Sequence, residues 1–297
     1  MRVLVSGASG LVGSEVIRQL RAEGHEALRL VRRKASSSDE VEWNPSTGYL
    51  QEGIMETIDA VVNMAGATTG KIPWTAKYKE EIVNSRLDST RTLVKAMQSA
   101  KNRPEVLVSG SASGFYGDTG DKVLLESAPK GTGFLSDLAH AWEQEALKAP
   151  TEVRVVLART TMVMSRKLGA LGRLLPLIKL GIGGPLGSGK QWWAWISLPD
   201  EAAAIIHLIK TPSAKGAYNL TAPEPATCGQ IVKALARDLH RPSLISVPAF
   251  AMKLLIGEAA VELLLCSQNM SADRLLKTGF KFQHPTLREA SAWVTQK

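Results

Sequence analysis

Residues 1–13 read MRVLVSGASGLVG and combine a short β-branched run with three glycines spaced three residues apart. Residues 2–6 are typical of a buried strand, and residues 14–23 have the pattern of a helix that ends at Gly24. Glycines placed this way between a strand and a helix are typical of a loop that binds the pyrophosphate of a dinucleotide. We therefore predict such a loop at the amino terminus, made of Gly7, Ala8, Ser9, Gly10, Leu11, Val12 and Gly13.

The three glycines have separate predicted roles. Gly7 permits a tight turn, Gly10 lets the backbone approach the phosphates, and Gly13 lets the helix pack close to the sheet. The first turn of the helix presents free N–H groups and a partial positive charge to the ligand. A glycine-rich turn without a ligand is the alternative, and the strand–turn–helix context argues against it.

The segment after the second predicted strand, residues 27–31, indicates which dinucleotide is bound. An acid at this place would bind the ribose 2′-hydroxyl of NAD(H), but the sequence has Arg32-Arg33-Lys34 and no carboxylate. A guanidinium group suits a 2′-phosphate because it is planar and donates two hydrogen bonds at once. We predict NADP(H) rather than NAD(H), with Arg32 and Arg33 at the phosphate. A solvated run of charges is the alternative.

Strands and helices alternate over about the first 160 residues, which predicts βαβ units and a parallel sheet covered on both faces. The predicted fold class is α/β, a Rossmann-type doubly wound parallel sheet with a smaller, mostly helical carboxyl-terminal lobe. A hairpin or an irregular stretch is expected over residues 43–50. The further predicted strands are residues 59–64, 106–109 and 153–159, and the further helices are residues 77–100 and 134–148.

The sequence changes character after Ser165. Residues 169–189 contain seven glycines and two prolines, which predicts a loop-rich excursion without a regular element. We assign residues 1–165 to the dinucleotide-binding domain, with residues 190–220 returning to it. Residues 166–189 and 221–297 form the predicted substrate-side lobe. Its expected elements are helices at 227–239, 248–266 and 287–294, and the returning part has a helix at 200–209 and a strand at 218–220.

Composition excludes several kinds of partner. Lys and Arg outnumber Asp and Glu by 36 to 28, but the basic residues are scattered, so nucleic acid is not expected as a partner. Two cysteines without CxxC or histidine spacing predict neither a disulfide framework nor a metal site. The amino terminus does not look like a signal peptide, and no apolar run reaches the roughly 18 residues of a membrane span. We predict a cytoplasmic protein without a membrane partner.

Several segments resemble the extended short-chain dehydrogenase/reductases. These are Asn63-Met64-Ala65-Gly66, the serine-rich stretch from Ser109 to Tyr116-Gly117, Arg159-Thr160, and Trp195-Ile196-Ser197-Leu198-Pro199-Asp200. A narrower resemblance runs nearly end to end. It is carried by Asn84-Ser85-Arg86-Leu87, Trp142-Glu143, and residues 180–189 (LGIGGPLGSG) followed by Gln191 and Trp195. These motifs resemble an atypical branch of epimerase-family proteins, some described by similarity as SulA-like cell-division inhibitors.

The resemblance implies an NADP-binding fold and leaves the substrate, an unknown small molecule, open. It places Arg32 and Arg33 at the 2′-phosphate. It also implies a possible homodimer through the helices at 77–100 and 134–148. The other implied cofactor-binding residues are Met64, Ala65 and Gly66 on the adenosine side, Glu81 and Arg86 on the long helix, and Thr160 and Val163 near the nicotinamide.

The catalytic pair of that family is missing here. The family uses a Tyr and a Lys four residues later, and the Lys lowers the Tyr pKa so that the phenol can exchange a proton. Glu143 gives the register, which places Leu135 at the Tyr position and Ala139 at the Lys position. Tyr116 and Ser111 are the predicted substitutes, with Ser113 and His140 as further candidates. Packing within its loop is an equal alternative for Tyr116.

The tryptophans that follow the glycine-rich stretch have two possible roles. Trp192, Trp193 and Trp195 either roof a pocket over the nicotinamide or pack in a core between the lobes.

Three functions follow from this reading. The first is an NADP(H)-dependent oxidoreductase or epimerase with a non-standard proton donor, since hydride transfer is the cofactor's own chemistry. The second is a non-catalytic NADP(H) sensor or regulatory binding protein, which the missing Tyr/Lys pair favours. The third is a regulator of cell division, which rests on the resemblance alone. The fold does not decide among them.

Overall fold

The computed structural model describes residues 1–166 and 169–296. Within them, the main sheet has the strand order β11-β8-β6-β5-β1-β2-β3-β4, and every neighbouring pair is parallel except β3 and β4. The strands are β1 Arg2–Ser6, β2 Glu26–Val31, β3 Glu40–Asn44, β4 Tyr49–Leu50, β5 Ala60–Asn63, β6 Val106–Ala112, β8 Arg154–Thr160 and β11 Gly216–Leu220. Residues 43–50 therefore form the hairpin, not the irregular stretch, of the two predicted forms.

The chain reverses the direction in which it adds strands between β1 and β5. It first builds outward through β2 and β3, and then returns to the other side of β1 and adds β5, β6, β8 and β11. Parallel sheets of this kind bind ligands at the carboxyl edge of the strands, beside the reversal. The predicted Rossmann-type fold class is confirmed, and the glycine loop after β1 lies at this edge.

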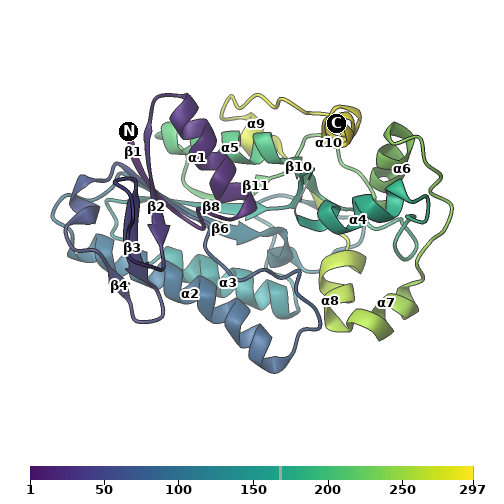
Figure 1. The fold of residues 1–297 in the computed structure, drawn as a ribbon, viewed down its shortest axis with the longest axis horizontal. Coiled ribbons are helices and arrows are strands. Elements are labelled where there is room, and N and C mark those ends of the chain that lie inside the picture. Colours follow the sequence, from purple (N-terminus) through teal and green to yellow (C-terminus); the bar gives the residue numbers. More distant parts are fainter. Residues whose placement is uncertain (167–168, 297) are drawn as a thin grey trace.

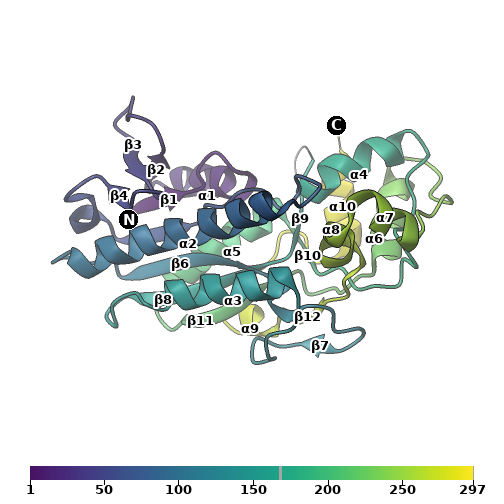
Figure 2. The same ribbon diagram turned by 90° about the horizontal axis from the view of Figure 1, so that it is seen from below.

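Helices cover both faces of the sheet (Figures 1 and 2). On one face, α1 Leu11–Ala22 and α5 Leu198–Lys210 pack over Val3 and Val5. On the other face, α2 Ala76–Ser99 and α3 Phe134–Ala146 contribute to the core that contains Leu4. Alternate residues of β1 point to opposite faces, so a central strand buried on both sides reads as a continuous apolar run.

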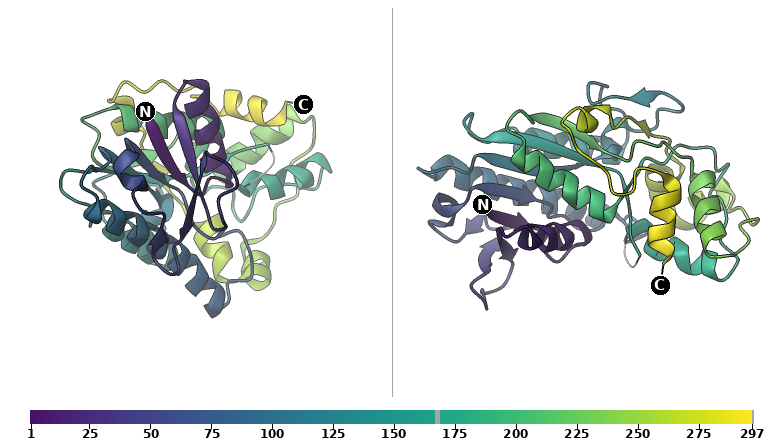
Figure 3. Two further views of the ribbon diagram at one scale, coloured as in Figure 1. Left: turned by 60° about the vertical axis from the view of Figure 1, so that its left-hand side comes forward. Right: turned by 90° about the horizontal axis from the view of Figure 1, so that it is seen from above.

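A smaller, mostly helical lobe lies at the far end of the sheet from the amino terminus (Figures 1 and 3). Its core joins three helices, α4 Gly169–Lys179, α6 Cys228–Asp238 and α10 Leu287–Thr295, with Trp193 and Trp195. Trp193 and Trp195 therefore take the core-packing role of the two predicted ones, whereas Trp192 is half-buried and its indole N–H donates to Asp121. The remaining elements of the lobe are α7 Ala249–Ile256, α8 Glu258–Ala260, the π-helical turn η3 Val261–Leu265 and α9 Asp273–Leu276. The exact division into two domains stays a prediction.

Short elements connect the lobe to the sheet. Strand β9 Met162–Met164 pairs with β10 Trp195–Ser197, and β7 Val123–Leu124 pairs with β12 Asn269–Met270. Two 3₁₀ turns, η1 Ile54–Thr57 and η2 Ser113–Tyr116, follow the hairpin and β6. After α4, the chain returns through β10 and α5 to β11, the edge strand of the main sheet.

The prediction that residues 169–189 contain no regular element is wrong. The first part of the stretch, residues 169–179, is helix α4 although Pro176 lies inside it. Leu171, Leu175 and Ile178 recur at helical spacing and are fully or almost fully buried against α6. Their burial outweighs the backbone cost of one proline and one internal glycine. The glycines that do break the chain are those after residue 180.

The described part of the chain bears on three features that the sequence did not predict: a membrane span, a metal site and a disulfide. No helix there is long and apolar enough to cross a membrane. No cluster of His, Cys, Asp or Glu among those residues is arranged to hold a metal ion. Cys228 and Cys266 are both free thiols, and burial raises the pKa of each thiol well above its ordinary value.

Candidate functional site

The glycine loop is folded tightly against the end of β5. Gly7 has a φ of +65°, and a β-carbon on it would lie 2.5 Å from the carbonyl oxygen of Met64. A β-carbon on Gly13 would lie 2.3 Å from the carbonyl oxygen of Gly7. The N–H of Gly10 donates to Gly7 across the turn at 2.8 Å. Larger residues at Gly7 and Gly13 would therefore open the loop, in line with their predicted roles.

The loop presents the first turn of α1 to solvent. Gly10 is the N-cap of this helix and provides no side-chain cap, and Ser9 and Gly10 are exposed. The N–H groups of the first turn are thus available to an anion from outside. The position at the carboxyl edge of β1, together with this free helix end, is the arrangement that binds a pyrophosphate.

The segment after β2 holds an ion pair that the sequence did not reveal. Arg33 donates two hydrogen bonds to the carboxylate of Glu40, at 2.7 and 2.6 Å, and Glu40 is the first residue of β3. The hydrogen bond from Arg33, followed by that from the Ser36 N–H, lowers the pKa of Glu40 to about 2. Arg33 is therefore held beside the end of β2 in a fixed orientation, and part of its hydrogen-bonding capacity is used.

Arg32 differs from its neighbours. Arg29 pairs with Asp39, and Arg33 pairs with Glu40. Arg32 is exposed and has no ion-pair partner among residues 1–166 and 169–296. Of the two arginines predicted to hold a 2′-phosphate, Arg32 is the one whose guanidinium group is available.

The end of β5 forms the opposite wall of the site. The hydroxyl of Ser6 donates to Asn63 at 2.6 Å and accepts from the N–H of Ala65 at 3.1 Å. The chain is thereby fixed at Met64, Ala65 and Gly66, the segment predicted to contact the adenosine.

Arg86, on α2, packs against that segment. Its guanidinium group is in the place that a side chain on Gly66 would occupy, with the Arg86 Cζ 2.9 Å from a β-carbon there. It donates to the carbonyl of Ala67 at 3.0 Å and lies over the ring of Trp142. Burial lowers the pKa of Arg86 to about 10. Arg86 is therefore positioned to hold the loop in place, whereas Glu81 is exposed on α2 and its predicted contact with the cofactor stays a prediction.

Thr160, at the end of β8, bonds to a buried acid. Its hydroxyl donates to Oε1 of Glu201 on α5 at 2.7 Å. Glu201 is completely buried, and its Oε2 has no partner among the described residues. Desolvation raises the pKa of Glu201 to about 8. Val163, the other residue predicted near the nicotinamide, lies in β9 and is partly buried against the same side of the sheet.

The state of Glu201 gives a testable pH dependence. A carboxyl whose pKa is raised on folding holds a proton that the unfolded chain has lost, so stability falls as pH rises from about 5 to 8. We expect Glu201→Gln to remove this loss, so that the free energy of unfolding of the wild type decreases relative to the variant by about 1 kcal/mol per pH unit. Urea denaturation at pH 5.5, 6.5 and 7.5 measures the difference. A constant difference across these values would contradict a protonated Glu201.

A buried network occupies the space between β6, β8 and α3. Arg159 and Glu143 form a two-point ion pair at 2.8 and 2.9 Å, with each side chain 5% exposed. Ser111 donates to Glu143 at 2.6 Å, and the guanidinium group lies 3.6 Å from the ring centroid of Phe115. Every charge here is paired and hydrogen-bonded, as burial requires.

Tyr116 belongs to the same network. Its hydroxyl donates to Oδ1 of Asn219 at 2.7 Å and accepts from Arg159 at 2.8 Å, and the residue is 1% exposed. Burial raises the pKa of Tyr116, although the neighbouring Arg159 acts in the opposite direction. A tyrosine that exchanges protons needs the reverse shift. These contacts favour the packing alternative for Tyr116, and the predicted catalytic roles of Tyr116 and Ser111 stay predictions.

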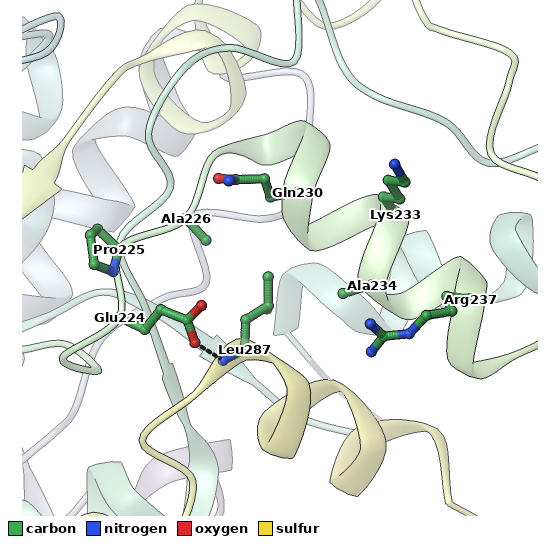
Figure 4. Close-up of a pocket in the computed structure, with 8 residues that line it drawn as sticks. All are labelled: Glu224, Pro225, Ala226, Gln230, Lys233, Ala234, Arg237 and Leu287. Carbon is green, nitrogen blue, oxygen red and sulfur yellow. Dashed lines mark hydrogen bonds between the residues drawn. The ribbon is translucent and has the colours of Figure 1, made fainter.

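A separate hollow in the small lobe lies away from these residues. Its volume is about 300 Å³, and it lies between α6 and the start of α10 (Figure 4). Glu224 accepts a hydrogen bond from the N–H of Leu287 at its edge. None of the residues predicted to bind the cofactor lines it.

Comparison with known proteins places the chain in a family. The model of the NAD-dependent epimerase/dehydratase family matches residues 3–221. The chain belongs to this family. A second model, a domain of unknown function called DUF1731, matches residues 247–294.

Individual relatives cover the whole chain. An epimerase family protein of Mycobacterium leprae is 37% identical over 296 residues, which are 99% of this chain and 96% of that one. A chloroplastic homologue of epimerase family protein SDR39U1 from Arabidopsis thaliana is 36% identical and covers 100% of this chain and 87% of its own. The crystal structure of human epimerase family protein SDR39U1 (isoform 2) with NADPH has a TM-score of 0.91 at 29% identity, covering 99% of both chains.

The part of this epimerase-family chain that replaces the Tyr/Lys pair is apolar. Leu135 packs with Tyr78, Ile82 and Leu138, and Ala139 is buried. An ionisable group nevertheless reaches the first turn of α3. The carboxylate of Glu262, from η3, accepts from the N–H groups of Phe134 and Leu135 at 3.2 and 3.1 Å. Glu262 lies 127 residues away in sequence, so no local pattern could have pointed to it.

Proposed function

We propose that this epimerase-family protein binds NADP(H) along the carboxyl edge of the sheet. The observation that carries the proposal is the joint geometry of the glycine loop, which leaves the first turn of α1 free, and Arg32, which is exposed at the end of the neighbouring strand. The loop suits the pyrophosphate, and the guanidinium suits a 2′-phosphate. The human relative whose structure contains NADPH supports the choice of cofactor.

We further propose that the protein is an oxidoreductase or epimerase acting on a small molecule. A bound nicotinamide would supply hydride transfer, so the chain needs only to orient the substrate and move a proton. Glu262 supports this proposal because its carboxylate binds the backbone N–H of Leu135, the residue that stands at the position of the family's Tyr. A carboxylate is one of the side-chain groups that act as a general base in enzymes.

The absence of a Tyr and a Lys on α3 favours the second candidate, a non-catalytic NADP(H) sensor. Leu135 and Ala139 cannot exchange protons, and the hydroxyl of Tyr116 is fully engaged with Asn219 and Arg159. A sensor requires only that binding changes the protein's conformation or contacts.

Turnover separates the two candidates. The pure protein is incubated with NADPH and a panel of aldehydes, ketones, quinones and nucleotide sugars, with Glu262→Gln and Tyr116→Phe assayed beside it. We expect consumption of NADPH that falls at least tenfold in Glu262→Gln and by less than threefold in Tyr116→Phe. Loss of activity in Tyr116→Phe alone would instead assign the proton to Tyr116. Tight NADPH binding with no turnover on the whole panel would favour the sensor.

A further inference from the structure

The small lobe carries a surface that its own core does not use. Helix α7 fully buries only Met252, and three of its large apolar side chains face solvent. Phe250 is 74% exposed, Leu254 83% and Leu255 77%. Soluble proteins rarely expose several large apolar side chains together, and such groups mark an interaction site.

The segment after α4 extends this surface. The N–H of Val247 donates to Pro185 and the N–H of Gly187 donates to Val247, so the two stretches of backbone lie side by side. α7 begins two residues after Val247, at the end of the molecule away from the amino terminus (Figures 1 and 2). Gly181 also lies against Pro242, and Gly184 against Ile245. The exposed apolar side chains of these two adjoining stretches and of α7 form what we call the apolar end surface: Leu180, Ile182, Leu244, Phe250, Leu254 and Leu255.

Charge identifies the kind of partner. Residues 169–190 and 239–257, which contain the apolar end surface, include no Asp or Glu. The acids on either side of the second segment, Asp238 and Glu258, are paired with Arg237 and Lys79. The exposed cations Lys179, Arg241 and Lys253 lie in the same two segments. A second copy of this surface would bring like charges together, whereas an anionic partner would be attracted.

We propose that the apolar end surface docks the protein peripherally on a membrane that contains anionic lipid. Apolar side chains on a short helix enter the boundary between headgroups and acyl chains, and neighbouring cations pair with anionic headgroups. The sequence predicted no membrane partner because it contains no apolar run long enough to span a membrane. A surface contact needs no such segment, because eight residues of α7 lie in the plane of the interface.

Vesicle sedimentation with the full-length protein tests this proposal. Vesicles of phosphatidylcholine with one third phosphatidylglycerol are compared with pure phosphatidylcholine vesicles, at 50 mM and 500 mM NaCl. We expect partitioning onto the anionic vesicles that is at least tenfold stronger than onto the neutral ones and weakens in high salt. Phe250→Ser/Leu254→Ser should reduce it at least tenfold. Lys179→Glu/Lys253→Glu should reduce it at least twentyfold, because each cation contributes about a factor of five.

Matched variants control for general effects. Val123→Ser removes an exposed apolar side chain elsewhere, and Lys95→Glu/Lys233→Glu reverses two exposed cations outside the surface. Both should bind as the wild type does, and all variants should keep the wild-type melting temperature because the altered side chains are exposed. No binding to anionic vesicles, or equal binding by surface and control variants, would overturn the proposal. A wild-type dimer that Phe250→Ser/Leu254→Ser makes monomeric would also overturn it and identify a self-association surface.

Discussion

Arg159→Leu is expected to destabilise the protein by about 3–5 kcal/mol, because it leaves the Glu143 carboxylate buried without its counter-ion. The same change removes the hydrogen bond to Tyr116 and the contact with the Phe115 ring. For a chain of this size, the loss corresponds to a melting temperature lower by about 10 °C. Urea denaturation followed by circular dichroism measures it.

Two further variants show whether the ion pair is the cause. Arg91→Ala removes an arginine whose pairs with Asp88 and Glu145 are more exposed, and it should cost less than about 1 kcal/mol. Arg159→Met/Glu143→Leu replaces both charges with apolar groups and should recover a large part of the lost stability. An unfolding free energy of Arg159→Leu within 1 kcal/mol of the wild type would show that the network does not hold this part of the fold together.

Arg32→Ala is expected to weaken NADPH binding by about 10- to 100-fold and to change NADH binding by less than threefold. The difference between the two cofactors is the 2′-phosphate, and a charge-assisted hydrogen bond to a phosphate contributes about 1.5–3 kcal/mol. Arg33→Ala should have a smaller selective effect, since Glu40 already accepts two hydrogen bonds from Arg33. Fluorescence titration with each cofactor measures both affinities.

An exposed arginine of the small lobe provides the control. Arg237 pairs with Asp238 on the surface, so Arg237→Ala should leave both cofactor affinities unchanged. Equal losses of NADPH and NADH affinity in Arg32→Ala would show that Arg32 does not bind the 2′-phosphate.

The sequence predicted most of the sheet because its strands are short apolar runs between glycines and turns. Val3, Leu4 and Val5 form such a run, and the structure buries all three completely. The glycine loop was equally visible, since its spacing has a direct steric meaning at Gly7 and Gly13. Helix α4 was missed because Pro176 and two glycines obscured the helical spacing of Leu171, Leu175 and Ile178.

The partners of three glutamates could not be predicted from the sequence. Glu40 lies seven residues from Arg33, across the turn that leads to β3, and no local rule predicts that their side chains meet. Glu143 served as a register mark for the missing Tyr/Lys pair, but its ion pair with Arg159 depends on the packing of α3 against β8. The contact between Glu262 and the start of α3 likewise depends on how the small lobe packs against α3.

The central claim is that the glycine loop and Arg32 together form an NADP(H) site. Isothermal titration of the full-length wild-type protein with NADPH and, separately, with NADH tests it most directly. We predict one NADPH site per chain, with an affinity at least tenfold higher than that for NADH. Failure to bind either cofactor, or an NADH affinity equal to or higher than that for NADPH, would contradict the claim.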